Sequence, residues 1–219
     1  MEADDMSESA NPGGLPPPFV LATGNPDKVR EIREILTGFP FRILSMDQAG
    51  FHGEIEENGA TFEENALIKA QAVHVHVGGG YVMADDSGLS IDALGGAPGI
   101  YSARFAGIEA GYPEKIAKIW SMLDHAGVSP RDWTASFHCA VAVIRPDGTW
   151  FATHGECRGL IIRELRGDNG FGYDPVFYVP AYGCTTAEMP PQQKHAISHR
   201  GLALRAMADR LRAEIGGHD

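Results

Sequence analysis

Two adjacent carboxylates, Asp85 and Asp86, follow directly after an apolar run at residues 81–84 and precede Ser87-Gly88. The run predicts a buried strand, and ligands of open α/β sheets bind beyond the carboxyl ends of such strands. Neighbouring carboxylates are costly there unless a cation or a proton offsets their charge. Mg²⁺ takes carboxylate oxygens and substrate phosphates, and further glutamates lie upstream at residues 54–57. A Mg²⁺ site is therefore favoured over the alternative, a turn in which Asp caps Gly-rich backbone.

A candidate phosphate site is Thr23-Gly24-Asn25-Pro26-Asp27-Lys28, between a predicted strand and a predicted helix. A helix N-terminus offers free backbone N–H groups and the positive end of a dipole, and Lys28 adds a charge. The alternative is a helix capped by Asn25 with a solvated lysine, and this segment alone does not decide between the two. The chain contains neither the G-x-x-x-x-G-K-[ST] pattern of a P-loop nor the G-x-G-x-x-G pattern of dinucleotide binding.

Three further segments carry side chains that could hold a nucleotide. The rings of Gly170-Phe171-Gly172-Tyr173-Asp174-Pro175 could stack on a base with Asp174 as an acceptor, although a tight turn explains the segment equally well. His199-Arg200 could present donors to a base edge or a phosphate. Spacing alone assigns no role to Lys69, because a lone helical lysine is usually solvated.

Two histidine pairs are weak indicators of zinc. His195 and His199 have the i,i+4 spacing of a zinc helix, but Ala196 stands where H-E-x-x-H requires Glu. His74 and His76 are two residues apart on a predicted helix, so they do not share a face. We therefore expect no zinc site.

The elements that must position these groups alternate between strands and helices. Apolar runs predict strands at residues 19–23, 41–46, 81–84 and 176–179, and Pro146-Asp147-Gly148 predicts a hairpin between residues 133–144 and 149–158. Helices are expected after the caps Asn25 and Thr61, the second in a capping box with Glu64, and at residues 112–126. A last helix at 198–214 has an apolar face made mostly of Leu202, Leu204, Ala208 and Leu211. We therefore expect an α/β fold with a mixed, twisted sheet.

Composition limits the partners and the compartment. The chain has 219 residues and a net charge of −11, which disfavours a nucleic-acid polymer because such binding relies on Lys and Arg. Residues 1–18 predict a flexible tail and residues 19–219 a single catalytic domain. We find no secretory signal and no apolar run near the length of a membrane helix, and the three cysteines lack C-x-x-C spacing. A reducing cytoplasm without membrane attachment is the simplest expectation.

The sequence resembles the inosine/xanthosine triphosphate pyrophosphatases, enzymes that cleanse the purine nucleotide pool. The matching stretches are LATGNPDKVREI (21–32), TFEENALIKA (61–70), ADDSGLSIDALGGAPGIYSARFAG (84–107), GFGYDPVF (170–177) and KHAISHRG (194–201). They are spread in order through nearly the whole chain after residue 18. The stretch around Asp86 is highly specific.

The resemblance implies an elongated, two-lobed α/β fold with a substrate cleft between the lobes, and usually a homodimer. It implies Mg²⁺-dependent attack of water on the α-phosphorus of non-standard purine triphosphates, such as those of inosine, deoxyinosine and xanthosine. Asp86 then resembles the general base and a metal carboxylate, and Glu57 its metal partner, although the stretch around Glu57 matches less closely. The groups that resemble the triphosphate site are Thr23, Gly24, Asn25, Pro26, Asp27, Lys28, Lys69 and Ser87. Those that resemble the base and sugar site are Phe171, Gly172, Tyr173, Asp174, Lys194, His199 and Arg200.

Chemistry and resemblance predict the same mechanism. Metal, Lys28 and Lys69 would neutralise charge on the phosphates, while Asp86 would orient and deprotonate water. Selectivity is expected from the 6-oxo edge of hypoxanthine, an acceptor where adenine carries a donor. The alternatives are a related pyrophosphatase for modified pyrimidine or methylated guanine nucleotides, and a nucleotide sensor without activity. The intact pair Asp85-Asp86, with Glu57, Lys28 and Lys69, argues against a sensor, because a sensor need not retain a carboxylate that activates water.

Overall fold

The sheet combines a short parallel part with a long antiparallel part. The computed structural model describes residues 17–216, in which the strand order is β2-β1-β3-β4-β5-β6-β7. Strands β1 (Pro18–Leu21) and β2 (Arg42–Ser45) are parallel, and β1 is also parallel to β3 (Tyr81–Ile91). From β3 onward each strand is antiparallel to its neighbour: β4 (Thr134–Ile144), β5 (Trp150–Ile161), β6 (Phe177–Val179) and β7 (Cys184–Thr185). The expected mixed α/β sheet is therefore confirmed.

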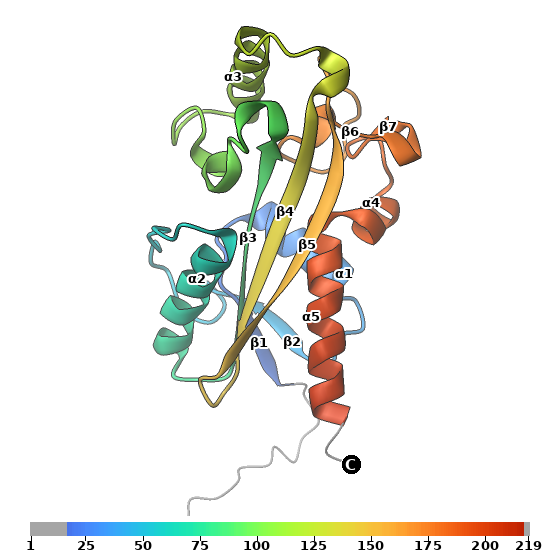
Figure 1. Ribbon diagram of the computed structural model, residues 1–219. Coiled ribbons are helices and arrows are strands. Elements are labelled where there is room, and N and C mark those ends of the chain that lie inside the picture. Colours follow the sequence, from blue (N-terminus) through green and yellow to red (C-terminus); the bar gives the residue numbers. More distant parts are fainter. Residues whose placement is uncertain (1–16, 217–219) are drawn as a thin grey trace, which may run out of the picture.

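The long strands β3, β4 and β5 form the twisted centre of the sheet and extend from the lower to the upper part of the molecule (Figure 1). The turn between β4 and β5 is closed by hydrogen bonds that Thr149 and Gly148 exchange with Arg145. The predicted hairpin is confirmed, and β5 continues three residues beyond the expected end at 158. The centre of the mixed sheet is therefore antiparallel.

Strand β3 is longer than the sequence predicts, and this changes the setting of the aspartates. We expected the strand to end at residue 84, but Asp85 and Asp86 both lie within β3, paired with Val141 and Ala140 of β4. The parallel partner β1 does end, at Leu21, which is in register with Met83. The aspartates therefore lie just beyond the end of the parallel ladder while remaining inside the antiparallel one. The expected strand end at residue 84 is therefore wrong, and so is the alternative of a turn at Asp85-Asp86.

The helix caps form as local chemistry predicts, with one difference. Helix α1 (Pro26–Ile35) begins at Asn25, whose Oδ1 accepts from the N–H groups of Asp27 and Lys28. Helix α2 (Phe62–Val77) begins at Thr61, whose Oγ1 accepts from Glu64 N–H at 3.1 Å. The return bond of the capping box is displaced, because the Glu64 carboxylate accepts from Ala60 N–H rather than Thr61 N–H. Gly78 ends α2 in the left-handed conformation, as its position after the apolar stripe predicts.

Helices cover both faces of the lower part of the sheet. Helix α5 (His199–Gly216) packs with α1 on one face, and α2 covers the opposite face (Figure 1). The stripe of α5 is buried at Leu204, Ala208 and Leu211, whereas Leu202 is 39% exposed and does not belong to it. The separate short helix α4 (Pro191–Ile197) precedes α5 and was not predicted.

The upper part of the molecule has its own apolar core (Figure 1). It is built from α3 (Tyr112–His125), the ends of the long strands, β6, β7 and 3₁₀ turns, of which η2 (Gly99–Arg104) matters for the site. Further 3₁₀ turns are Asp92–Leu94, Pro130–Asp132, Asp174–Val176 and Pro180–Tyr182. Of the predicted tail, residues 1–16 lie outside the described residues. Within residues 17–216 no helix is long and apolar enough to cross a membrane.

Candidate active site

A cavity of about 500 Å³ gathers residues from every part of the chain that carried a candidate motif. Its size is within the usual range for a small-molecule site. The predicted residues that line it are Thr23, Gly24, Asn25, Lys28, Glu57, Lys69, Asp86, Ser87, Phe171, Gly172, Tyr173, Asp174, Lys194, His199 and Arg200. Pro26 and Asp27 do not line it, and Asp27 instead forms a surface ion pair with Arg30.

Asp85 and Asp86 point to opposite faces of the sheet, because successive side chains of a strand alternate. Asp85 is fully buried, and its Oδ2 lies 3.1 Å from both Lys28 Nζ of α1 and Arg200 Nε of α5. Burial opposes ionisation here, but the charges of Lys28 and Arg200 outweigh it and hold the pKa of Asp85 well below its usual range. The two carboxylates therefore form ion pairs with different cations, and Asp85 is an internal counter-ion of Lys28 and Arg200.

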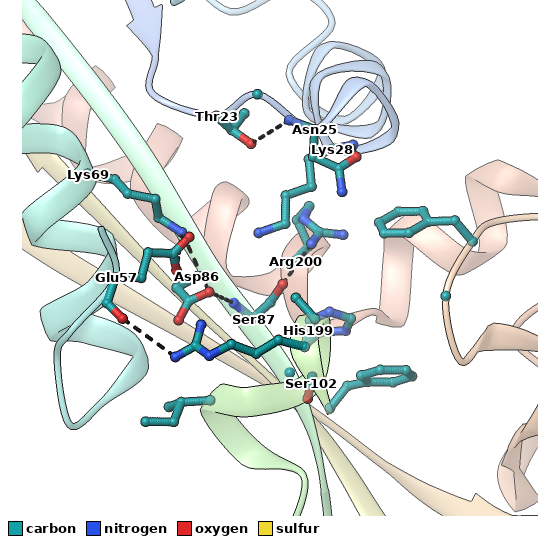
Figure 2. A pocket seen from close by; sticks show the side chains of 18 of the residues that line it. Thr23, Asn25, Lys28, Glu57, Lys69, Asp86, Ser87, Ser102, His199 and Arg200 are labelled. Carbon is teal, nitrogen blue, oxygen red and sulfur yellow. Dashed lines mark hydrogen bonds and ion pairs between the residues drawn. The ribbon is translucent and has the colours of Figure 1, made fainter. Parts of the chain in front are cut away.

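Asp86 faces α2 and the loop before it. Its Oδ2 accepts a hydrogen bond from Asn65 Nδ2 at 3.1 Å. Its Oδ1 lies 3.5 Å from Lys69 Nζ, and Figure 2 shows Lys69 and Asp86 side by side. Lys69 also donates to Glu57 Oε2 at 3.0 Å. Burial raises the pKa of Asp86, and the cations of Lys69 and Lys28 only partly compensate. The environments of Asp85 and Asp86 thus drive their pKa values apart, a common arrangement where one carboxylate acts as an acid or base.

Glu57 and Asp86 offer a donor set that fits Mg²⁺. Both carboxylates approach Lys69 Nζ, so their oxygens face a common point at the cavity wall. No cluster of three or more His, Cys, Asp or Glu side chains that could hold a metal exists within residues 17–216. Mg²⁺ is commonly held by one or two carboxylates together with substrate phosphates. The oxygen-only pair therefore suits a metal that enters with a nucleotide rather than a closed protein cage.

A buried chain of alternating charges joins the two sides of the cavity. Lys194 Nζ lies 2.6 Å from both Asp174 Oδ2 and Glu31 Oε1. Glu31 Oε2 in turn accepts from Arg200 Nη1 at 2.6 Å, and Arg200 continues to Asp85 and Ser87. Burial disfavours the Glu31 anion, yet Arg200 and Lys194 lower its pKa. These ion pairs hold α1, α4, α5 and the 170–175 loop together, because breaking any one pair would leave a buried charge without a partner.

The far end of the cavity is aromatic. Phe171 has Lys194 Nζ at 5.3 Å and Arg200 Cζ at 5.5 Å from its ring centroid, which is cation–π range. The His199 ring stacks on Phe137 with a centroid distance of 4.7 Å and an interplanar angle of 15°. Burial and the neighbouring cations lower the pKa of His199, so this imidazole is neutral. Its Nδ1 has no hydrogen-bond partner within residues 17–216.

The comparisons with known proteins agree with this geometry. The sequence profile of the Ham1 family matches residues 19–210, which include every residue of the cavity. The chain belongs to the Ham1 family.

Relatives and solved structures of the family cover nearly the whole chain. A dITP/XTP pyrophosphatase of Yersinia pseudotuberculosis is 47% identical over 196 residues, 89% of this chain and 98% of the relative. The structure of a HAM1 protein from Coxiella burnetii matches with a TM-score of 0.81 and 44% identity, covering 89% of this chain and 98% of that one. A nucleoside-triphosphatase / dITP/XTP pyrophosphatase from Mycobacterium abscessus matches with a TM-score of 0.70 and 37% identity, covering 87% and 98%.

Sequence reasoning did not single out three residues of this Ham1 chain that line the cavity or hydrogen-bond to the residues that line it. Glu31 shares a helical face with Lys28 and Ile32, and an acidic residue beside a buried stripe was the available signal. Asn65 is fully buried and joins Asp86 to the Gly59 backbone, whose N–H donates to Asn65 Oδ1 at 2.8 Å. Arg104 lines the cavity from η2, and the available signal was its place in the matching stretch 84–107, where no role was assigned to it.

The 3₁₀ helix η2 is packed tightly against the site strand. Ser102 Oγ accepts from Leu89 N–H at 2.9 Å and donates to Gly99 O at 2.6 Å, and Tyr173 Oη donates to Ser102 O at 2.8 Å. A side chain at Gly88 would collide with Gly99 O and Ser102 Oγ. Gly88 is therefore required for this close approach, directly after Asp86 and Ser87.

Proposed function

We propose that this chain hydrolyses non-standard purine nucleoside triphosphates, such as those of deoxyinosine, inosine and xanthosine, to the monophosphate and pyrophosphate. The observation that carries the proposal is Asp86, a carboxylate with a raised pKa beside Glu57 and Lys69 in a nucleotide-sized cavity. The names of the similar proteins from Yersinia pseudotuberculosis and Mycobacterium abscessus support the substrate class.

Phosphate binding is assigned to the N-terminal end of α1 and to two lysines. The first N–H groups of α1 already donate to Asn25, so the helix contributes mainly its dipole. Lys28 is 14% exposed and turned towards Asp85 rather than solvated, which keeps its ammonium at the cavity. Lys69 stands between Glu57 and Asp86, where it can offset charge that develops on a phosphate.

Asp86 is assigned as the general base that orients water and accepts its proton. A carboxylate whose pKa is raised by burial holds a proton more strongly, which favours proton abstraction near neutral pH. Mg²⁺, when bound by Glu57, Asp86 and the substrate phosphates, would supply further charge neutralisation. Asn65 holds the Asp86 carboxylate in place through its hydrogen bond.

Base recognition is assigned to the aromatic end. Phe171 offers a ring face, and the segment Gly172, Tyr173 and Asp174 shapes the wall behind it. The neutral His199, with an unpaired Nδ1, and the donors of Lys194 and Arg200 lie at the same end. A donor that faces the 6-oxo group of hypoxanthine would face an amino group in adenine, leaving two groups unpaired at about 1–3 kcal/mol each.

The test is product identification with a substrate panel. The full chain is incubated with Mg²⁺ and the triphosphates of inosine, deoxyinosine, xanthosine, adenosine, methylated guanosine and a modified pyrimidine, free of inorganic pyrophosphatase. Pyrophosphate is expected first, from the inosine and xanthosine compounds, and chelation of Mg²⁺ should abolish turnover. Orthophosphate without pyrophosphate, or preference for the methylated guanine or pyrimidine compound, contradicts the proposal.

The proposal includes a compartment and an assembly state. Cys139, Cys157 and Cys184 are all free thiols, as expected in a reducing cytoplasm. The homodimer that the resemblance implies stays a prediction. Light scattering coupled to size-exclusion chromatography measures it directly.

A further inference from the structure

Five lysine and arginine side chains line the cavity, and four of them are already paired with carboxylates. The pairs are Lys28 with Asp85, Lys69 with Glu57 and Asp86, Lys194 with Glu31 and Asp174, and Arg200 with Glu31 and Asp85. Arg104 is different, because no carboxylate within residues 17–216 forms an ion pair with its guanidinium. Its polar contact is Glu57 O, 3.5 Å from Nη2, and its Cζ lies 5.1 Å from the Tyr101 ring centroid.

Arg104 is placed at the metal and phosphate side of the cavity rather than at its aromatic end. Its contact with Glu57 O puts the guanidinium beside the residue that holds Lys69. The 3₁₀ helix η2 that carries it is fixed to β3 through Ser102 and through the close approach at Gly88. The guanidinium therefore projects from a segment that packs closely on β3, and it lies beside Glu57.

A half-buried guanidinium with one long hydrogen bond retains most of its donors for another acceptor. Arginine has five N–H donors in a planar fork that matches two oxygens of a phosphate. The nearby carboxylates of Glu57 and Asp86 are paired with Lys69 rather than with Arg104, so the free donors of Arg104 remain available to an incoming phosphate. We propose that Arg104 binds a phosphate oxygen of the substrate's triphosphate chain, as the cavity cation without a carboxylate partner among residues 17–216. This inference rests on the proposed function for its substrate.

The test uses inorganic tripolyphosphate, which carries the whole phosphate chain without base or sugar. Its dissociation constant is measured by calorimetry with Mg²⁺ for wild type, Arg104→Ala, Arg104→Gln and Arg104→Lys. Loss of a charged hydrogen bond predicts affinity about tenfold weaker or worse for the Ala and Gln variants, with Lys intermediate because it keeps the charge without the fork. The matched control is Arg131→Ala, since Arg131 is exposed and does not line the cavity.

The Gln variant separates binding from a purely structural role. The Gln amide can still donate to Glu57 O. If Arg104 only anchored the backbone at Glu57, the Gln variant would therefore bind tripolyphosphate as well as wild type does. Tripolyphosphate affinity of Arg104→Gln within about twofold of wild type, with an unchanged melting temperature, overturns the inference. Failure of wild type to bind tripolyphosphate overturns it as well. Neither the affinity nor the melting temperature depends on turnover. Failure of the proposed function alone is therefore recognised separately: the wild-type protein would bind tripolyphosphate but would not hydrolyse inosine triphosphate.

Discussion

Asp85→Asn and Asp86→Asn make the same chemical change at adjacent positions, and the structure predicts different effects: a loss of stability at position 85 and a loss of turnover at position 86. Asp86 is buried with a raised pKa, so its charge is held at some cost to folding. Asn at position 86 removes that charge, can still accept from Asn65, and leaves Lys69 paired with Glu57. We expect a change of less than about 1 kcal/mol in unfolding free energy. Turnover should fall by about 10²–10⁴, because Asn cannot accept a proton.

Asp85→Asn should instead destabilise the fold. Asp85 is fully buried, and both Lys28 and Arg200 lie 3.1 Å from its Oδ2. Breaking a buried ion pair costs about 3–5 kcal/mol, and the lower end applies because Arg200 keeps Glu31. For a chain of this size about 3 kcal/mol corresponds to a fall of about 6–12 °C in melting temperature. Asp85 Oδ1 has no hydrogen-bond partner within the described chain, so an Asn amide placed there would be buried without an acceptor.

The assay measures kcat for pyrophosphate release from inosine triphosphate and the thermal unfolding of both variants without Mg²⁺. Asp147→Asn is the control, since Asp147 is exposed in the hairpin turn and its Oδ1 accepts from Thr149, which Asn can also do. If Asp86→Asn keeps more than about a tenth of wild-type kcat, another residue activates the water. If Asp85→Asn has the same melting temperature as wild type, ion pairing is not what permits a buried carboxylate in β3.

Two further predictions concern the residues around this pair. The substitution Asn65→Asp keeps the acceptor for Gly59 N–H but replaces the donor to Asp86. Steady-state kinetics should therefore show a fall in kcat of at least about tenfold with a smaller change in KM. Equal changes in kcat and KM would argue against a positioning role for Asn65. The pKa values of Asp85 and Glu31 are lowered by folding, so their stabilisation is present above about pH 4 and is lost as the pH falls further. Urea unfolding between about pH 7 and pH 3 should show this loss, and Asp85→Asn should show a smaller one; identical slopes would contradict it.

Local chemistry in the sequence determined where the elements begin and turn. Asn25 before Pro26, Thr61 with its bond to Glu64 and the turn at Asp147 use only neighbouring atoms, so residue type predicts them. Specific motifs likewise indicated the family and most of the residues that line the cavity. These features do not depend on how distant segments meet.

Tertiary structure decided what the two aspartates do. The sequence predicted a strand that ends at the pair, because the apolar run ends at residue 84, yet both carboxylates lie inside β3, where they are unfavourable without compensation. That compensation comes from Arg200, 115 residues away from Asp85, and from Lys28 and Lys69 on different helices. Strand alternation then separates the roles, since Asp85 meets α1 and α5 while Asp86 meets α2 and Glu57. No local pattern carries this information, because the partners of each carboxylate are set only when the helices pack on the two faces of the sheet.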